Sequence, residues 1–184
     1  MATQGTFQSN TSENADLNQY WYSEKTCEVL CAAVKESISL KGGTSARVAF
    51  LSTPSLYFSL NEQDRKQCTL FDFDTSLGAT SYNYNNPTNI DAELHHIFDV
   101  IVVDPPFITQ SVWESYAITV ALLGVKENPH IICTTVEANA SLMERLFQCK
   151  LTRFQPSIPK LVYQYNTYAN FNSSTLSTIN SELE

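Results

Sequence analysis

The sequence has few basic residues and no long apolar run, and each shortage argues against a class of protein. Lys and Arg total 11 against 19 Asp and Glu among 184 residues, a formal charge of −8, which argues against nucleic acid as the main partner. No apolar run of about 18 residues occurs, so we expect no membrane span. The five cysteines are odd in number and unevenly spaced, and the polar N-terminus lacks a signal-peptide pattern. We therefore expect reduced thiols in a cytoplasmic protein.

Glycine is also scarce, which bears on the kind of ligand the chain can bind. There are five Gly and no Gly-x-Gly-x-x-Gly pattern, so a phosphate-cradling dinucleotide loop is not indicated. Ser52, Thr53, Pro54 and Ser55 stand where such a loop would follow the first predicted strand. Their hydroxyls, with the amides of a following helix, suit a ligand carboxylate; the alternative is a simple helix cap.

Strand and helix signals alternate along the middle of the chain. Strands are predicted at residues 47–51, 69–73, 98–103 and 130–135; helices are predicted at 23–40, from Pro54, behind a capping-box pattern at 111–114, and around 142–147. Near-continuous apolar strands separated by helices predict an α/β protein with a parallel sheet covered on both faces. Residues 151–154 and 161–168 are expected to pair as a closing antiparallel hairpin.

Polar segments flank this region. Residues 1–18 and 169–184 are rich in Ser, Thr and Asn and poor in apolar side chains. Such segments bury too little surface to offset their ordering entropy, so we expect a disordered N-terminal tail and a polar C-terminal tail. The folded domain is predicted to span residues 19–168.

The segment Asp104-Pro105-Pro106-Phe107 follows the strongest strand signal. Two prolines stiffen the turn and remove two backbone donors, while their carbonyls and the Asp carboxylate remain as acceptors. Phe107 adds a flat apolar face. Such a turn suits an amine, which must donate hydrogen bonds while it exposes a lone pair. The alternative is a strand-ending turn with a solvated carboxylate.

Two acids end the second predicted strand. Asp72 and Asp74 lie two residues apart, so they share one face if the strand continues that far. An acid at this place often binds a ribose hydroxyl pair. Asp74 is favoured slightly because it lies nearer the carboxyl tip.

Several motifs in order along the chain resemble one enzyme family. They are Gln19-Tyr20-Trp21-Tyr22-Ser23, the run 51–58 (LSTPSLYF), Leu70-Phe71-Asp72-Phe73-Asp74, the run 82–87 (YNYNNP) and Asp104-Pro105-Pro106-Phe107. Together they resemble the elongation factor 1-alpha lysine methyltransferase family, over residues 19–168. Asp-Pro-Pro-aromatic by itself is shared by many enzymes that methylate amino groups.

The resemblance implies a fold, a cofactor and a set of site residues. The fold would be a Rossmann-like class I methyltransferase, with a mostly parallel seven-stranded sheet and helices on both faces. Asp104, Pro105, Pro106 and Phe107 would be catalytic. S-adenosylmethionine would be held by Ser52, Thr53, Pro54, Ser55, Asp72, Asp74 and Asn83. Tyr20, Trp21 and Tyr22 would lie near the substrate; for each, packing at the sheet edge is the alternative.

Two positions depart from the family pattern. The family often has Tyr where this chain has Phe107, so a hydroxyl-dependent role is lost there. It often has Asp where this chain has Asn83, which leaves a weaker, uncharged acceptor for the cofactor adenine.

The position of charge informs the choice of substrate. No Lys or Arg occurs from Gln67 through Val125, the stretch that contains Asp72 and Asp104. An acidic site attracts a cationic cofactor and a lysine-bearing partner, so we expect a protein substrate, elongation factor 1-alpha by the resemblance. An RNA or DNA adenine methyltransferase and a non-enzymatic cofactor-binding subunit are the alternatives. No metal is expected, because Cys27 and Cys31 favour core packing over zinc.

Overall fold

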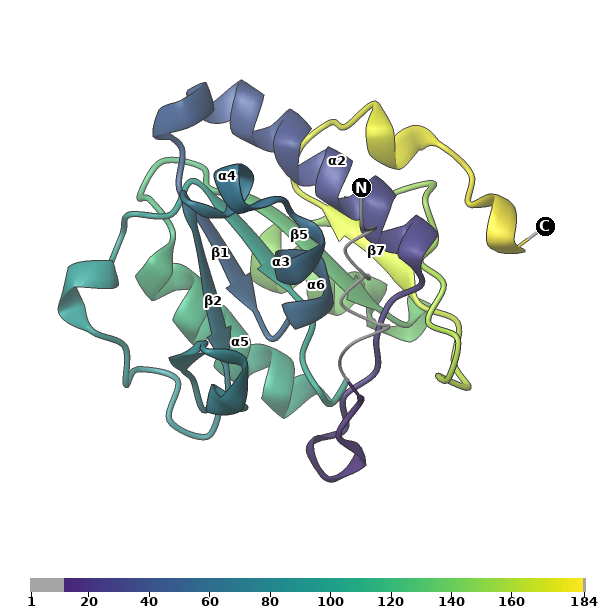
Figure 1. Cartoon of the computed structure of the whole chain (residues 1–184), viewed down its shortest axis with the longest axis horizontal. Helices are drawn as coiled ribbons and strands as arrows, with labels where there is room; N and C mark the ends of the chain where they lie inside the picture. Colours follow the sequence, from purple (N-terminus) through teal and green to yellow (C-terminus); the bar gives the residue numbers. More distant parts are fainter. Residues whose placement is uncertain (1–11, 184) are drawn as a thin grey trace, which may run out of the picture.

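The computed structural model describes residues 12–183, which are built around one sheet (Figure 1). In spatial order its strands are β3 (Thr80–Ser81), β2 (Cys68–Asp72), β1 (Val48–Leu51), β4 (Val100–Val103), β5 (His130–Thr135), β7 (Asn166–Ala169) and β6 (Lys150–Leu151). The first five of these run parallel, and β7 runs antiparallel to both of its neighbours. The predicted Rossmann-like, mostly parallel seven-stranded sheet is therefore confirmed.

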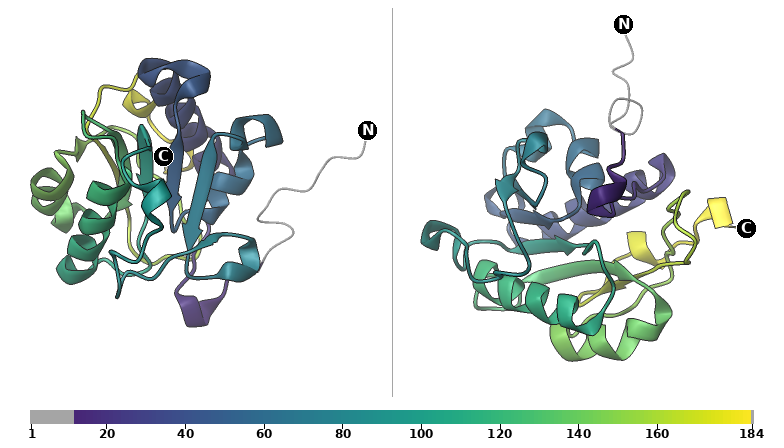
Figure 2. Two further views of the ribbon diagram at one scale, coloured as in Figure 1. Left: turned by 90° about the vertical axis from the view of Figure 1, so that its left-hand side faces the viewer. Right: turned by 90° about the horizontal axis from the view of Figure 1, so that it is seen from below.

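Helices cover both faces of the sheet, as Figure 2 shows. The α-helices of the described residues are α2 (Glu24–Lys41), α3 (Pro54–Ser59), α4 (Glu62–Arg65), α5 (Gln110–Leu123) and α6 (Ala140–Phe147). Short 3-10 helices lie at Ala15–Leu17, Gly43–Ser45, Thr75–Leu77, Ala92–Leu94, Glu137–Asn139, Thr175–Ser177 and Ser181–Leu183. The helices α2 and α3 pack on one face, and α5 and α6 pack on the other.

The central strands β1 and β4 explain why the strongest strand signals are continuous apolar runs. Every residue in both strands is buried. Within β1, Phe50 faces the core beneath α2, whereas Ala49 and Leu51 face the core beneath α5. Side chains alternate between the two faces of a strand, so a strand covered on both faces needs apolar residues at every position.

The helix ends agree with the sequence in one case and differ in another. Ser23 caps α2, because its Oγ accepts a hydrogen bond from the Thr26 amide at 3.1 Å. The capping box predicted at residues 111–114 is wrong, since α5 begins at Gln110 behind Thr109. The Glu114 carboxylate instead accepts a hydrogen bond from Gln110 Nε2 within α5 and another from Arg145 Nη2 of α6.

The closing antiparallel pair exists but is shorter than predicted. Lys150–Leu151 pairs with Tyr168–Ala169, and the chain between them is largely irregular. Pro156 and Pro159 lie in this connection, where each removes a backbone donor that a longer ladder would need.

The N-terminal segment is more ordered than predicted where the structure describes it. Of the predicted disordered tail, residues 1–11 lie outside the described residues, whereas Ala15–Leu17 form a 3-10 helix capped by Asn14. The Asn18 side-chain amide donates to the Pro106 carbonyl oxygen, so this segment reaches the catalytic turn predicted from the sequence.

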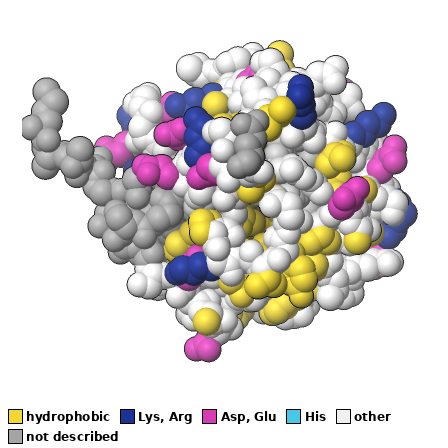
Figure 3. Space-filling view, turned by 90° about the vertical axis from the view of Figure 1, so that its right-hand side faces the viewer, with side chains coloured by type: hydrophobic (Ala, Val, Ile, Leu, Met, Phe, Trp, Pro, Cys, Tyr) yellow, Lys and Arg dark blue, Asp and Glu magenta, His cyan; other side chains and the backbone are white. Residues whose placement is uncertain are grey.

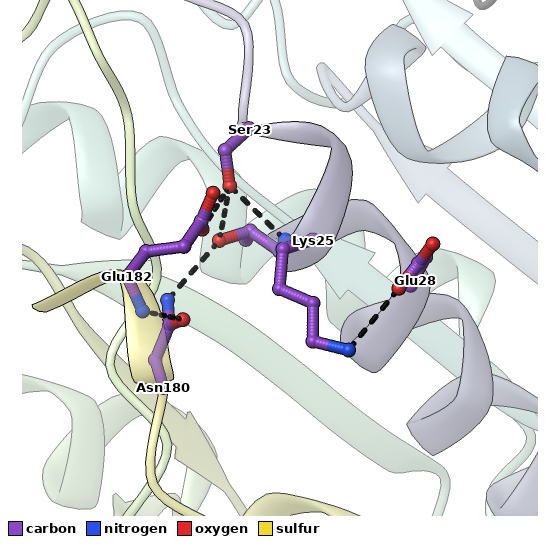
Figure 4. Close-up of polar contacts among 6 residues, drawn as sticks. Ser23, Lys25, Glu28, Asn180 and Glu182 are labelled. Atoms are coloured by element: carbon purple, nitrogen blue, oxygen red, sulfur yellow. Dashed lines mark hydrogen bonds and ion pairs between the residues drawn. The ribbon is translucent and has the colours of Figure 1, made fainter.

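The C-terminal segment also packs against the domain. Ala169 belongs to β7, and residues 173–175 donate four hydrogen bonds to the Glu36 carboxylate of α2. Farther along, Glu182 accepts from Ser23 Oγ at the start of α2, as Figure 4 shows. Polar composition suggested a tail at both ends, but polar side chains with matched partners can order a segment without burying much apolar surface.

Across residues 12–183, no helix combines the length and apolarity needed to cross a membrane.

Candidate active site

A pocket of about 220 Å³ opens at the carboxyl ends of β1, β2 and β4. Parallel strands present their carboxyl ends at one edge of a sheet, which is where ligands bind in open α/β folds. The pocket brings together every site residue predicted from the sequence except Asp74: Tyr20, Trp21, Tyr22, Ser52, Thr53, Pro54, Ser55, Asp72, Asn83, Asp104, Pro105, Pro106 and Phe107.

Asp104 lies at the tip of the central strand β4, as the buried apolar run predicted. Its amide donates to the Leu51 carbonyl, which fixes it beside the end of β1. Tyr22 Oη donates to Asp104 Oδ2 at 2.6 Å. Burial raises the pKa of the Asp104 carboxyl to about 7, although the hydroxyls of Tyr22 and Thr134 oppose that rise. The carboxylate can therefore take up or release a proton near neutral pH.

The turn after Asp104 combines a stiff backbone with an aromatic side chain. Pro105 is buried, and the Pro106 carbonyl accepts from Asn18 Nδ2. Phe107 is 47% exposed and meets Tyr84 edge to face, with ring centroids 6.5 Å apart. An aromatic wall thus stands next to the acceptors of the turn, where it can shield an incoming amine from water.

The loop after β1 holds a strained backbone. Ser52 has φ of 57°, a left-handed conformation that residues other than Gly adopt rarely. Its amide donates to the Phe71 carbonyl, and its Oγ lies 2.6 Å from the Tyr116 Oη. These contacts hold in place a loop that lacks glycine.

Thr53 supplies a polar group with no partner of its own. It is 1% exposed, lines the pocket, and its Oγ1 makes no hydrogen bond within the described structure. Pro54 follows at the first turn of α3, as predicted. A buried, unpaired hydroxyl costs free energy unless a ligand atom bonds to it, so the loop fits a ligand with a polar group here.

The two acids after β2 have different environments. The strand ends at Asp72, which is 7% exposed and lines the pocket. Burial raises the pKa of the Asp72 carboxyl to about 6. Asp74 caps the Thr75–Leu77 helix and accepts from Gln19 Nε2 at 3.1 Å, and it is absent from the pocket lining. The strand therefore ends before Asp74, the acid that the sequence slightly favoured, and of the two acids only Asp72 lines the pocket.

The aromatic segment before α2 borders the pocket. Tyr22 is 2% exposed, Trp21 is buried, and Tyr20 is 38% exposed. The Trp21 amide donates to Glu13 Oε1 at 2.8 Å, and the Ser23 amide donates to the Ser157 carbonyl. All three side chains line the pocket, and Trp21 and Tyr22 are also buried, so the role of this segment near the substrate stays a prediction.

Four contributors escaped sequence analysis. Tyr116 of α5 supports the loop after β1 through its hydroxyl, a role that the predicted helix behind residues 111–114 did not indicate. Thr134 is the next-to-last residue of β5. Tyr165 lies in residues 161–168, which were predicted to pair in the closing hairpin, and Asn18 lies in the predicted N-terminal tail; both line the pocket. The one available signal was at Thr134, a hydroxyl residue near the carboxyl end of a buried strand.

The pocket is acidic. Its lining contains Asp16, Asp72 and Asp104 and, over the described residues, no Lys, Arg or His. Such a surface favours a cationic ligand and disfavours a polyanion. Within residues 12–183, no three His, Cys, Asp or Glu side chains gather as a metal site, and the Cys27 and Cys31 thiols are buried against the backbone of α3.

Comparison with known proteins places these features in a family. A family model described as "Probable N6-adenine methyltransferase" matches residues 13–173. A protein-lysine N-methyltransferase of Caenorhabditis elegans is 32% identical over 178 residues, covering 89% of this chain and 80% of the relative. EEF1A lysine methyltransferase 1 is 30% identical in Gallus gallus, covering 88% and 76%, and 28% identical in Homo sapiens, also covering 88% and 76%.

The match extends beyond the predicted domain of residues 19–168 at both ends and includes the Ala15–Leu17 helix, which borders the pocket. The similarity spans most of this chain and includes the Asp-Pro-Pro-Phe turn after β4. The chain belongs to this family of methyltransferases, the one whose curated members include EEF1A lysine methyltransferase 1.

Proposed function

We propose that this protein is an S-adenosylmethionine-dependent protein-lysine N-methyltransferase that modifies elongation factor 1-alpha in the cytoplasm. The observation that carries the proposal is a half-buried Asp104 on a rigid Pro-Pro turn, inside a pocket lined by acids and by no described cation. Names of the relatives support lysine as the acceptor and elongation factor 1-alpha as the protein.

The pocket residues fit the cofactor group by group. The unpaired Thr53 hydroxyl and the Ser52 loop suit the methionine carboxylate. Asp72, at the end of β2, suits the ribose hydroxyls, and Asn83 suits the adenine. When bound, S-adenosylmethionine supplies an activated methyl group on a sulfonium centre. Its positive charge matches the acidic lining.

Asp104 can orient a lysine amine for methyl transfer. Lysine is a nucleophile only when neutral, and its deprotonation at pH 7 costs about 4.6 kcal/mol from a reference pKa of about 10.4. The Asp104 carboxyl, with a pKa of about 7, can accept an N–H bond and aim the nitrogen lone pair. The Pro105 carbonyl is the second acceptor that we assign to the amine. Phe107 and the aromatic segment disfavour the ammonium form by excluding water.

Adenine methylation is the second candidate, because the family model carries that description. The same turn could accept from an exocyclic amino group of a base. The acidic pocket counts against it, since a nucleic acid would bring phosphates to a surface with Asp16, Asp72 and Asp104.

The deciding experiment transfers labelled methyl from S-adenosylmethionine to purified elongation factor 1-alpha, total RNA and DNA in parallel. We expect label in lysine of the protein, and slower association at higher salt because exposed charges are screened beyond about 8 Å at 0.15 M. Label in RNA or DNA alone would establish the adenine activity instead. Calorimetric binding of the cofactor without transfer to any of the three would indicate a non-enzymatic binding subunit.

A further inference from the structure

Tyr22 and Asp104 are 82 positions apart in the sequence, yet their side chains meet at the floor of the pocket. Tyr22 Oη lies 2.6 Å from Asp104 Oδ2 and 2.5 Å from Thr134 Oγ1. The phenol donates to the carboxylate, so the short contact with Thr134 has the threonine hydroxyl as donor to the phenol oxygen. The three side chains form a directed chain that ends on Asp104.

The backbone around Tyr22 is held from several sides. Ser23 caps α2, and its amide donates to the Ser157 carbonyl at 2.9 Å. Ser23 Oγ also donates to Glu182 Oε2 in the C-terminal segment (Figure 4). Asn180 Nδ2 donates to the Gln155 carbonyl and to Thr26 Oγ1. The start of α2 is thus clamped between two distant loops, which fixes where the Tyr22 ring can lie.

We propose that Tyr22 is a positioning residue for the Asp104 carboxylate. Its hydroxyl, supported by Thr134, binds Oδ2 and orients the group so that its other oxygen accepts from the substrate amine. The inference rests on the proposed function, and it assigns Tyr22 a task different from contact with the substrate.

The electrostatic surroundings of Asp104 make these hydroxyls matter. The titratable groups that face it are Tyr22, Tyr116 of α5, Cys133 of β5 and Tyr165 before β7. Burial raises the pKa of each of them, so all are neutral at pH 7. With no described cation lining the pocket, the carboxylate charge is stabilised by the hydrogen bond from Tyr22, whose oxygen accepts in turn from Thr134.

Tyr22→Phe tests the proposal, because it removes the hydroxyl and keeps the ring. Loss of a hydrogen bond to a charged group should lower kcat about tenfold or more, with the KM for S-adenosylmethionine little changed. The acidic limb of the rate profile should move to higher pH by about one unit, since the carboxylate has lost a donor. Thr134→Val should act in the same direction with a smaller effect, and Thr134→Ser should restore the wild-type profile.

The matched control is Tyr168→Phe. Tyr168 is also buried, and its hydroxyl donates to the Val136 carbonyl, outside the pocket lining. This variant loses one phenol hydroxyl from the same domain, so we expect an unchanged pH profile. Thermal unfolding of all variants separates an effect on the carboxylate from an effect on folding.

A second readout does not need activity. NMR titration of the Asp104 carboxyl in aspartate-labelled protein should show a higher midpoint in Tyr22→Phe than in the wild type and in Tyr168→Phe. An unchanged midpoint, or an unchanged kcat together with an unchanged acidic limb, would overturn the proposal while leaving the proposed function intact. If wild-type protein methylates no protein substrate, the proposed function fails, and the titration still decides whether Tyr22 sets the ionisation of Asp104.

Discussion

Asp104 in the pocket and Glu36 on α2 are carboxylates in opposite situations. Burial raises the pKa of Asp104 to about 7, because two hydroxyls do not offset the loss of water. Partial burial also acts to raise the pKa of Glu36, but donors from residues 173–175 outweigh it and lower the pKa to about 2. Asp104 can therefore take up a proton and accept a hydrogen bond from a ligand. The oxygens of Glu36 instead accept the hydrogen bonds that hold the C-terminal segment against α2.

This contrast separates a functional region from a structural one by the supply of hydrogen-bond donors. At the pocket, Thr53 and Asp104 retain bonding capacity that a ligand can satisfy. On α2, the Glu36 carboxylate already accepts four hydrogen bonds, which Ser173, Ser174 and Thr175 donate. Substitutions in the two regions should therefore change different measured quantities.

The largest expected effect is on turnover at the pocket. Asp104→Ala removes a preorganised acceptor, so kcat for methyl transfer should fall at least about 100-fold while the affinity for S-adenosylmethionine stays nearly unchanged. Single-turnover transfer and calorimetry measure the two quantities. Asp91→Ala, an exposed acid outside the pocket lining, serves as control. Turnover close to wild type in Asp104→Ala would show that this carboxylate is not catalytic.

Substitution of Glu36 on α2 should lower the stability of the protein rather than its turnover. Glu36→Ala removes the acceptor of four hydrogen bonds and should lower the free energy of unfolding by about 1–3 kcal/mol, with transfer rates little changed. Denaturant unfolding measures the loss, and Glu28→Ala, an exposed acid on the same helix, is the control.

The pH dependence of this loss has a definite sign. A depressed carboxyl pKa contributes stability above the unfolded-state value of about 4.5, and that stability is lost as the pH falls toward about 2. The stability difference between wild type and Glu36→Ala should shrink across that window. A difference that stayed constant would mean that ionised Glu36 is not what fixes the segment.

Asp104→Asn should show the reverse, a gain in stability at the expense of activity. The folded-state pKa of Asp104 is raised, so the wild type loses stability as the pH rises from about 3.8 to about 7. Asn has no charge to bury and can still accept from Tyr22, so the variant should be more stable by about 1–2 kcal/mol at pH 8. Equal stability of the two proteins at pH 8 would contradict the burial effect.

The smallest effect concerns the rim. Asp16 is exposed and lines the pocket, whereas Glu93 is exposed and lies outside the lining. Asp16→Lys should raise the KM for a protein substrate by about two- to fivefold at low salt, the scale of one exposed charge interaction, and Glu93→Lys should not. Equal effects of both changes would indicate a general influence of net charge rather than contact at the pocket.

Local pattern was sufficient for the central layer of the molecule. Strands covered on both faces must be apolar at each position, so the runs at β1, β4 and β5 could be located from sequence. Their alternation with helices predicted the parallel sheet, and the carboxyl end of β4 predicted the place of Asp104. The structure then gathers in one pocket all but one of the site residues that the resemblance of short motifs predicted.

Local pattern failed where a partner is distant in sequence. Tails were predicted at both ends because their polar composition indicates that they bury little apolar surface. Composition does not show the hydrogen bonds that Glu36 and the Pro106 carbonyl accept from residues far away in the sequence.

The choice between Asp72 and Asp74 had the same limit, since it depended on the residue at which β2 ends. Tyr22 is the clearest case. The sequence by itself determined that an aromatic residue precedes α2 and that Asp104 follows β4, but only tertiary structure brings the two into contact, because a side-chain hydrogen bond across 82 positions leaves no periodicity in either segment.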